Sequence, residues 1–213
     1  APFLSLICLL APLAVRATAA DAALMKMVMP DAEMVIGIDA DRIMKAPFGQ
    51  LVMAEIDKEG KAQDLQKFIG MTGFDPRRDL KEIVFAARNT SAAMEQKDNP
   101  RKAASRGGLV MVRGLFNEAK IRSLASLDKE ISSGSYKGVT LLSKDQSEEV
   151  AALLGGSVLV VGHKKEVEAA IDRYQSREAA ALRIGPAVER ASGNYDIWIA
   201  GVVSPAMLAG HSG

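Results

Sequence analysis

Two closely spaced pairs of side chains in this sequence are of the types that hold metal ions or transfer protons. Asp39 and Asp41 form an Asp-x-Asp pair after a short apolar run, and His163 and Glu166 stand three residues apart where a helical pattern starts. A zinc site needs three or four ligands at recognisable spacing, and neither an HExxH motif nor a third ligand accompanies either pair. We therefore treat these residues as weak metal candidates, expect no cofactor, and regard helix capping as the simpler role for the two aspartates.

A second charged cluster, Asp75-Pro76-Arg77-Arg78-Asp79, lies between an apolar helical pattern and an apolar strand pattern. A catalytic role would require a buried carboxylate with a shifted pKa, or an arginine that faces a cleft. Asp75 followed by Pro76 instead has the form of a helix N-cap and first helical residue. We predict a structural corner in which Asp79 and the two arginines are solvated surface charges.

Composition and the remaining motifs limit the classes of function. The chain has 27 basic and 26 acidic residues, and this balance argues against nucleic-acid binding, which requires a surplus of positive charge. The sequence contains no G-x-S-x-G nucleophile elbow, no G-x-x-x-x-G-K phosphate loop and no dinucleotide fingerprint. We expect a non-enzymatic protein that binds an envelope partner or a small ligand. The alternative is an exported hydrolase or metal-dependent enzyme with an acidic or histidine-containing site.

The beginning of the chain predicts export. The run from Pro2 to Val15 is almost continuously apolar and small residues follow it, which is the pattern of a secretory signal peptide. Arg16 ends the apolar run before it reaches the roughly 20 residues that a membrane span needs. We expect residues 1–20 to be a signal peptide that is cleaved after Ala19 or Ala20. The mature protein would then be periplasmic or secreted, with no membrane span.

The mature part, residues 21–213, is expected to be a single α+β domain. Residues 89–106 are polar, charged and broken by Pro100, so we expect a flexible loop there. Ser204-Pro205 has the form of a helix start with little chain after it, which favours a missing C-terminal portion. Cys8 is the single cysteine and belongs to the leader, so the mature chain would contain no disulfide and no thiol site.

Apolar periodicity predicts the secondary structure, because short apolar runs indicate strands and spacings of three and four indicate helices. Strands are expected at 34–38, 83–87, 109–112, 139–142, 150–154, 158–161 and 195–203, and helices at 42–46 with Asp41 as the N-cap, 47–69 with an interruption at Gly60, 117–127, 163–174 and from 186. The order βαββαβββαβ predicts a mainly antiparallel sheet with helices on one face. Its first six elements match a split βαβ (ferredoxin-like) unit. Repeated strand–turn–helix segments make a duplicated ancestor a further hypothesis.

Two local patterns give sharper expectations. Gly155-Gly156 can adopt the positive φ angles of a two-residue hairpin turn. Trp198 alternates with Ile197 and Ile199 in a strand pattern, so we expect it on the opposite face of the sheet from those two residues.

Three runs carry a resemblance to a known group of proteins: "MPDAEMVIGIDADRIMKAPFGQLV", "GFDPRRDLKEIVFAAR" and "LVVGHKKEVEAAI". They resemble exported bacterial proteins of unknown function, in which a signal peptide precedes repeated strand–helix segments and an "fDp.rDl"-like turn. The resemblance implies an envelope or secreted location, and it brings no catalytic residues with it.

Overall fold

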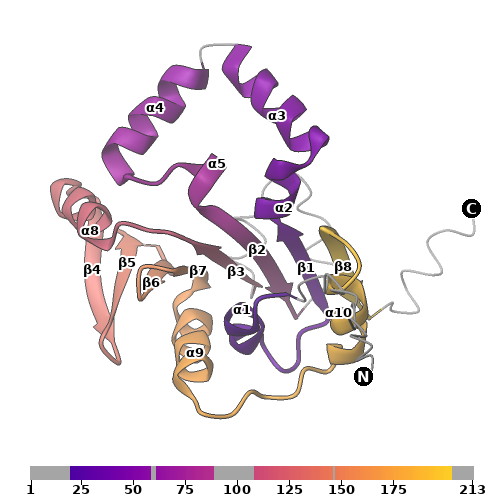
Figure 1. Ribbon diagram of the computed structural model, residues 1–213. Coiled ribbons are helices and arrows are strands. Elements are labelled where there is room, and N and C mark those ends of the chain that lie inside the picture. Colours follow the sequence, from indigo (N-terminus) through magenta and orange to yellow (C-terminus); the bar gives the residue numbers. More distant parts are fainter. Residues whose placement is uncertain (1–19, 59–60, 89–107, 146, 203–213) are drawn as a thin grey trace, which may run out of the picture.

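The computed structural model describes residues 20–58, 61–88, 108–145 and 147–202 (Figure 1). In this part of the chain, eight strands form one sheet in which every neighbouring pair is antiparallel. The strands are β1 (Met34–Asp39), β2 (Leu80–Ala87), β3 (Gly108–Gly114), β4 (Ile131–Tyr136), β5 (Val139–Lys144), β6 (Glu149–Leu154), β7 (Val158–His163) and β8 (Ile197–Gly201). The helices are α1 (Ala22–Met27), α2 (Ala40–Lys45), α3 (Pro47–Lys58), α4 (Lys61–Thr72), α5 (Pro76–Asp79), α8 (Glu118–Leu127), α9 (Lys164–Gln175) and α10 (Gly185–Ser192). The predicted α+β class with an antiparallel sheet is confirmed.

The strand order is β4-β5-β6-β7-β3-β2-β1-β8. Strands β1 to β3 form one meander and β5 to β7 form another, and the two meet where β3 pairs with β7. Each meander is extended by a strand from the other half, because β4 pairs with β5 and β8 pairs with β1. The split βαβ arrangement is not confirmed. Such a unit places another strand between the two that its helix connects, whereas β1 and β2 are direct neighbours.

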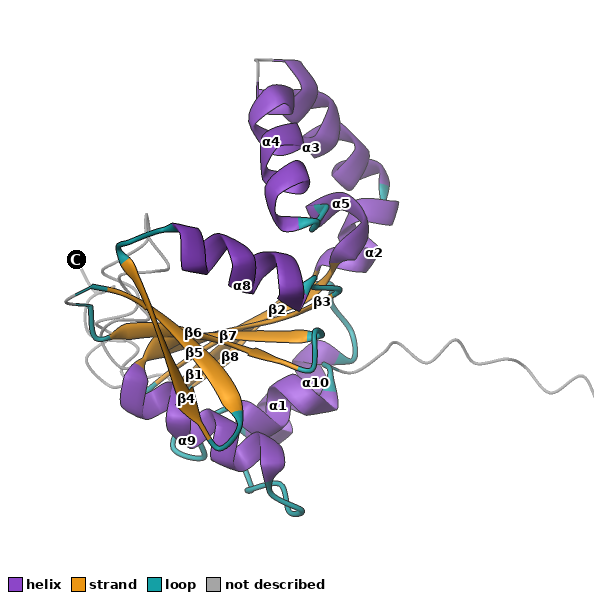
Figure 2. Ribbon diagram, turned by 90° about the vertical axis from the view of Figure 1, so that its left-hand side faces the viewer, coloured by secondary structure: helices purple, strands orange, loops and turns teal. Residues whose placement is uncertain are grey.

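One face of the sheet is closely packed against α1, α9 and α10 (Figure 2). Strand residues on this face alternate with residues on the other face, as the two-residue period of a strand requires. The largest fully buried side chains of this core are Leu24, Met27, Val28, Met29, Val35, Val84, Leu109, Met111, Val158, Val160, Val167 and Ile171. The predicted helix at 163–174 is confirmed as α9, whose apolar face supplies Val167, Ala170 and Ile171 to the core.

Helix α8 lies on the other side of the sheet (Figure 2). The prediction that all helices cover one face is therefore wrong. The physical reason is visible in β6, where Val150 to Leu154 is a continuous apolar run. Both faces of this strand therefore carry apolar side chains, and each face is more stable when a helix packs on it. Helices α3 and α4 form a hairpin that projects beyond the sheet, and the end of α4 contacts α8 (Figure 1).

Edge strand β8 shows the alternation that its sequence predicts. Trp198 is 5% exposed, whereas Ile197 and Ile199 are 57% and 66% exposed. The indole lies on β1 at Gly37, where a Cβ atom would come within 2.2 Å of Cε2 and Cζ2 of the ring. Glycine is therefore required at this position of β1.

Two hairpin turns join strands in the second half of the chain. Gly155 and Gly156 have φ angles of 57° and 64° between β6 and β7, so the predicted positive φ angles are confirmed. The loop has three residues rather than the predicted two, because Leu154 pairs with Val158. Lys137 and Gly138, with φ angles of 46° and 80°, make a comparable turn between β4 and β5. Strand β4 was not expected, because its central residues, Ser132 to Ser135, are polar and exposed and carry no apolar alternation.

Three predicted features fall on parts of the chain that are not described. Residues 1–19 of the expected signal peptide, the expected flexible loop at 89–106, and the chain after residue 202 lie outside the described residues. Among the helices that are described, none combines the length and the apolar character needed to cross a bilayer.

Candidate functional site

The Asp-x-Asp pair is accounted for by local structure. Asp39, rather than the expected Asp41, caps α2, and its Oδ1 accepts a hydrogen bond of 2.9 Å from the backbone N–H of Arg42. Asp41 forms ion pairs with Lys45 and Lys81, the latter with an Nζ–Oδ1 distance of 2.7 Å. The hydrogen bonds from Lys45 and Lys81 hold the pKa of Asp41 below its ordinary value. A carboxylate held ionised by two ammonium groups is a poor proton acceptor.

His163 and Glu166 each pair with a different residue. Nε2 of His163 lies 2.7 Å from Oε2 of Glu148, and Oε1 of Glu166 lies 2.7 Å from Nη1 of Arg88. Across the described ranges, His, Cys, Asp and Glu side chains do not form any group of three or more that could hold a metal ion. The four candidates, Asp39, Asp41, His163 and Glu166, therefore remain separate residues, each with a protein partner.

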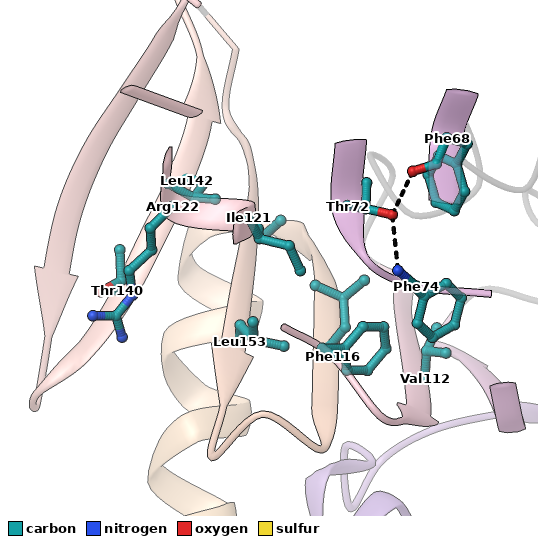
Figure 3. A pocket seen from close by; sticks show the side chains of 12 residues that line it. Phe68, Thr72, Phe74, Val112, Phe116, Ile121, Arg122, Thr140, Leu142 and Leu153 are labelled. Atoms are coloured by element: carbon teal, nitrogen blue, oxygen red, sulfur yellow. Dashed lines mark hydrogen bonds between the residues drawn. The ribbon is translucent and has the colours of Figure 1, made fainter. Parts of the chain in front are cut away.

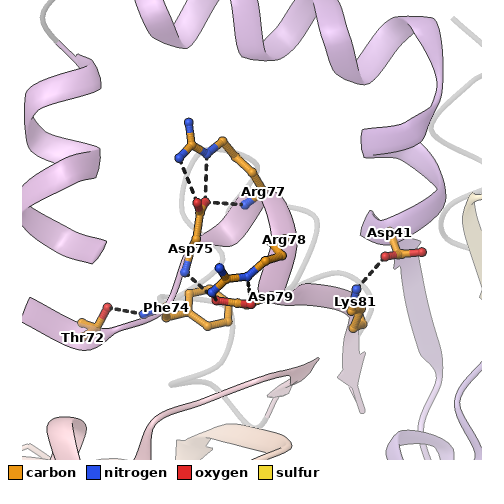
Figure 4. Close-up of polar contacts among 8 residues, drawn as sticks. All are labelled: Asp41, Thr72, Phe74, Asp75, Arg77, Arg78, Asp79 and Lys81. Atoms are coloured by element: carbon orange, nitrogen blue, oxygen red, sulfur yellow. Dashed lines mark hydrogen bonds and ion pairs between the residues drawn. The ribbon is translucent and has the colours of Figure 1, made fainter. Parts of the chain in front are cut away.

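The charged corner is confirmed in its main feature (Figure 4). Asp75 is the N-cap of α5, with Pro76 in the first turn and a 3.1 Å hydrogen bond from the backbone N–H of Arg77 to Asp75 Oδ1. The prediction that Asp79 is a solvated surface charge is wrong, because Asp79 is 2% exposed. Its Oδ2 accepts a 2.8 Å hydrogen bond from the backbone N–H of Asp75, and Arg78 donates to both of its oxygens at 2.7 and 2.9 Å.

These contacts give the corner a structural role. The hydrogen bond from Arg78 is the main cause that lowers the pKa of Asp79, and the hydrogen bond from Arg77 does the same for Asp75. Both carboxylates are thus stabilised as anions, which is the opposite of what a general base near neutral pH requires.

An apolar cavity of about 300 Å³ lies between α4, α8 and the sheet (Figure 3). Its walls come from α4, from the segments before α5 and α8, from α8 itself and from strands β3, β5, β6 and β7. The lining residues are Phe68, Thr72, Phe74, Val112, Phe116, Ile121, Arg122, Thr140, Leu142, Ala151, Leu153 and Leu159. The strand residues among them alternate with those of the packed core, so the cavity belongs to the opposite face of the sheet.

Aromatic rings form one wall of this cavity. The rings of Phe74 and Phe116 are stacked with centroids 4.8 Å apart, and Phe68 meets Phe74 edge-on at 6.3 Å. Thr72 contributes no free polar group, because its hydroxyl donates to the backbone oxygen of Phe68 at 2.7 Å and accepts from the N–H of Phe74 at 3.1 Å. Three of the six phenylalanines in the sequence gather in this wall.

A charged residue, Arg122, lies at the rim of the cavity, and an open cleft adjoins it. Arg122 is the one charged residue among the twelve described residues of the lining, and its guanidinium pairs with Glu118 at 3.0 Å. An open cleft of about 680 Å³ shares Thr72, Ile121 and Leu142 with the cavity and continues along α8. The cleft ends at exposed apolar side chains, including Leu127, which is 77% exposed. Cavity and cleft together offer a mainly apolar surface, with Arg122 in the lining of the cavity and Asp128 and Lys129 in the lining of the cleft.

The residues that line the cavity are mainly apolar. The described part of this lining includes no histidine, cysteine, aspartate or glutamate, so it supplies no acid–base pair. The adjoining cleft is also lined by Asp128 and Lys129. The sequence pointed to none of these residues as a site. The available signal was the continuous apolar character of the strands at 150–154 and 158–161, which indicates that the second face of the sheet is apolar as well.

Comparison with known proteins adds little to this description. A scan against models of protein families found no match, and a search of curated proteins found none at a significant level. Solved structures that are similar to this chain include three crystal forms of TP0453. Form III aligns over 82% of this chain and 61% of its own, with 11% identity and a TM-score of 0.46. Form IV aligns over 70% of this chain and 52% of its own, with 13% identity and a TM-score of 0.39. Form I aligns over 72% of this chain and 52% of its own, with 11% identity and a TM-score of 0.38. This chain therefore spans less than two thirds of those structures, and a likeness at these scores carries no argument about function.

Proposed function

We propose that this protein is an exported, non-enzymatic binding protein that holds a small apolar ligand, or the apolar part of a larger one, in the cavity between α4, α8 and the sheet. The observation that carries the proposal is a hollow of about 300 Å³ with a nearly uniform apolar lining. Protein interiors contain few voids larger than a water molecule, and ligand pockets begin at about this volume. The leader at residues 1–20 supports a periplasmic or secreted location.

The walls favour a ligand with an aromatic or acyl body. Stacked rings such as Phe74 and Phe116 offer a flat apolar surface, and the leucines of the sheet offer a rounded one. Arg122 stands at the rim with a side chain that is 56% exposed, so its guanidinium is free to turn from Glu118 towards an acidic head group. The ligand that fits best is thus an apolar molecule with an anionic end.

The proposal is tested by titrating the protein with the neutral apolar dye N-phenyl-naphthylamine and measuring fluorescence. Ala151→Leu adds a side chain inside the cavity, and we expect it to weaken dye binding by about tenfold, a change of ~1.4 kcal/mol. Ala119→Leu is the matched control, since Ala119 is an exposed residue of α8 outside the lining, and it should leave the affinity unchanged. Equal binding by the parent protein and Ala151→Leu, or no binding by the parent, would refute the proposal.

The alternative of an exported hydrolase or metal-dependent enzyme has less support. Each of its candidate residues, Asp39, Asp41, His163 and Glu166, is engaged with a different partner in the structure. A hydrolase of this kind would need at least a nucleophile or metal-bound water beside a base, and these residues do not converge on one site.

The strand order supports the hypothesis that the fold arose by duplication of an ancestor. If β1, β2, β3 and β4 are exchanged with β5, β6, β7 and β8, the order of the sheet is reproduced in reverse. The helices do not follow this symmetry, since α8 and α9 lie on opposite faces (Figure 2). A duplication would therefore have been followed by a rearrangement of the helical layer in one half.

A further inference from the structure

A second cavity, of about 220 Å³, lies where α1 begins, and its chemistry is acidic. Its lining residues are Ala20, Asp21, Asp39, Glu82, Ser192, Tyr195 and Trp198. The three carboxylic acids come from separate parts of the chain: the residue before α1, the end of β1, and β2. The apolar ligand proposed above has no role here, so this cavity requires its own explanation.

The backbone nitrogen of Asp21 makes a specific long-range contact in this cavity. Its N–H donates a 2.9 Å hydrogen bond to Oε2 of Glu82, which is 61 residues away in the sequence. The side chain of Asp21 is also fixed, because Oδ1 caps α1 through the N–H groups of Ala23 and Leu24, and Oδ2 lies 3.5 Å from Nε of Arg113. The position of this nitrogen is thus set by contacts on both sides.

Glu82 lies in an unbalanced electrostatic environment. The charged groups that face it are Asp21 before α1, Asp39 on β1 and Arg113 on β3, and the hydroxyl of Tyr195 also lines the cavity. Burial is the main cause that raises the pKa of Glu82 to about 7, and the charges of Asp21 and Asp39 act in the same direction. The hydrogen bond from Asp21 and the charge of Arg113 act against them. The site therefore carries more negative charge than Arg113 alone can balance.

We propose that the Ala20–Asp21 bond is the processing site of the exported chain, and that the α-ammonium group created on Asp21 forms a partly buried ion pair with Glu82. This inference rests on the export part of the proposed function. The sequence leaves cleavage after Ala19 or after Ala20 open, and the contact between Asp21 and Glu82 favours the second. Only the second cut converts the nitrogen that already contacts Glu82 into a cation.

The chemistry of the step is peptide hydrolysis by a leader-removing peptidase and one water molecule. The C–N bond between Ala20 and Asp21 breaks, the carbonyl carbon of Ala20 gains an oxygen and leaves as a carboxylate, and the nitrogen of Asp21 gains protons. An α-amino group has an ordinary pKa of about 7.7–8.0, so beside three carboxylates it is protonated at neutral pH. The new cation supplies the positive charge that the cavity lacks.

The ion pair would secure α1 on the sheet. Leu24 and Met27 of this helix are fully buried and pack in the core with α9 and β3. Removing one partner of an ion pair that is partly shielded from water is destabilising, because the other charge is then left without compensation. Processing would thus complete the core by fixing the first turn of α1, in addition to releasing the leader.

The first measurement is the N-terminal sequence and intact mass of the protein exported from its full gene. We expect a mature chain that starts at Asp21. An exported chain that starts at Ala20 or at another residue would overturn this inference alone, whereas retention of the whole leader inside the cell would overturn export as well. Dye binding in the apolar cavity is measured independently of both outcomes.

The second measurement compares denaturant unfolding of two chains, residues 21–213 and 20–213, each with and without Glu82→Gln. The chain that starts at Asp21 should have an unfolding constant about 10- to 100-fold smaller than the chain that starts at Ala20. Glu82→Gln should reduce this difference to about twofold or less. Glu130→Gln, at a side chain that is 66% exposed, is the control and should preserve the difference. A difference that survives Glu82→Gln, or no difference in the parent protein, would overturn the ion pair.

The pH dependence gives an independent readout if Glu82→Gln does not fold. In the chain that starts at Ala20, folded Glu82 keeps its proton up to a pH of about 7, while the unfolded chain loses it at a lower pH. The folded state then binds more protons in this window, so the free energy of unfolding should fall as the pH rises through it. In the chain that starts at Asp21, the pair favours the ionised Glu82, and this fall should be absent. Identical pH profiles for the two chains would contradict the proposal.

Discussion

The two faces of the sheet are built from the same strands, yet they are packed very differently. In β6, Ala152 and Leu154 are 1% and 4% exposed, whereas Ala151 and Leu153 on the other face are partly exposed and line the cavity. In β8, Trp198 is buried at 5%, and its neighbour Ile199 is 66% exposed. The residue types are equally apolar on both sides, so the difference arises from the helices that cover each face. The face under α1, α9 and α10 forms the closely packed core, and the face under α8 retains a cavity.

The largest effect is expected from truncation of the packed face. Leu109→Ala removes a fully buried side chain from the centre of the core, which should lower the free energy of unfolding by about 2–5 kcal/mol. Leu153→Ala makes the same chemical change beside an existing cavity and should cost about half as much or less, because part of the side chain is already exposed. Urea denaturation of the two variants measures the difference. Equal losses would mean that the two faces are packed equally well.

The next effect concerns the contact between strands β1 and β8. Gly37→Ala places a Cβ atom 2.2 Å from the ring of Trp198, so the indole must shift, at a cost of about 1–3 kcal/mol. The fluorescence of this single tryptophan should move to longer wavelength as the ring becomes exposed. Gly134→Ala, in edge strand β4, is the matched control, because no atom lies within 4 Å of the place its new methyl group would take, and stability should hardly change. An unchanged emission spectrum in Gly37→Ala would show that the indole does not depend on this glycine.

A third effect is expected at the corner that links α4 to β2. Asp79→Asn loses the two-hydrogen-bond pair with Arg78 and should destabilise the protein by about 1–3 kcal/mol at neutral pH. Contacts in the folded state lower the pKa of Asp79, so its contribution is present above the ordinary pKa of an aspartate and is lost as the pH falls through the folded value. The parent protein and Asp79→Asn should therefore converge in stability under acid conditions. Asp64→Asn, at a side chain that is 85% exposed, should change little at any pH, and an equal loss there would contradict a special role for Asp79.

The elements were predictable from sequence where a local pattern decides them. Alternating or continuous apolar runs located seven of the eight described strands, and spacings of three and four located α8 and α9. Strand β4 is polar on both sides, and α1 is only six residues long and depends on α9 for its burial, so neither has a local signal. Capping chemistry predicted the turn at Asp75, but the burial of Asp79 depends on how the chain folds back over it.

The cavity could not be predicted, because its walls depend on the order of the strands. Phe74 and Phe116 are 42 positions apart in the sequence and stack only because β3 carries the second ring back beside the end of α4. Local periodicity does not specify which strand pairs with which, and the pairings of β3 with β7 and of β1 with β8 follow from no rule of spacing. The sequence indicated that both faces are apolar, but not that α8 would leave one of them partly open.

The smallest effect is expected on the open face, at Ile197 and Ile199. Replacement of either by threonine keeps the branched shape that favours a strand and removes apolar surface that is already more than half exposed. We therefore expect a change of about 0.5 kcal/mol or less in the free energy of unfolding, measured by urea denaturation beside Leu109→Ala. A loss above about 1.5 kcal/mol would mean that these side chains are buried in the folded protein. The contrast between the two faces would then be confined to the region under α8, and the argument for binding would rest on the cavity alone.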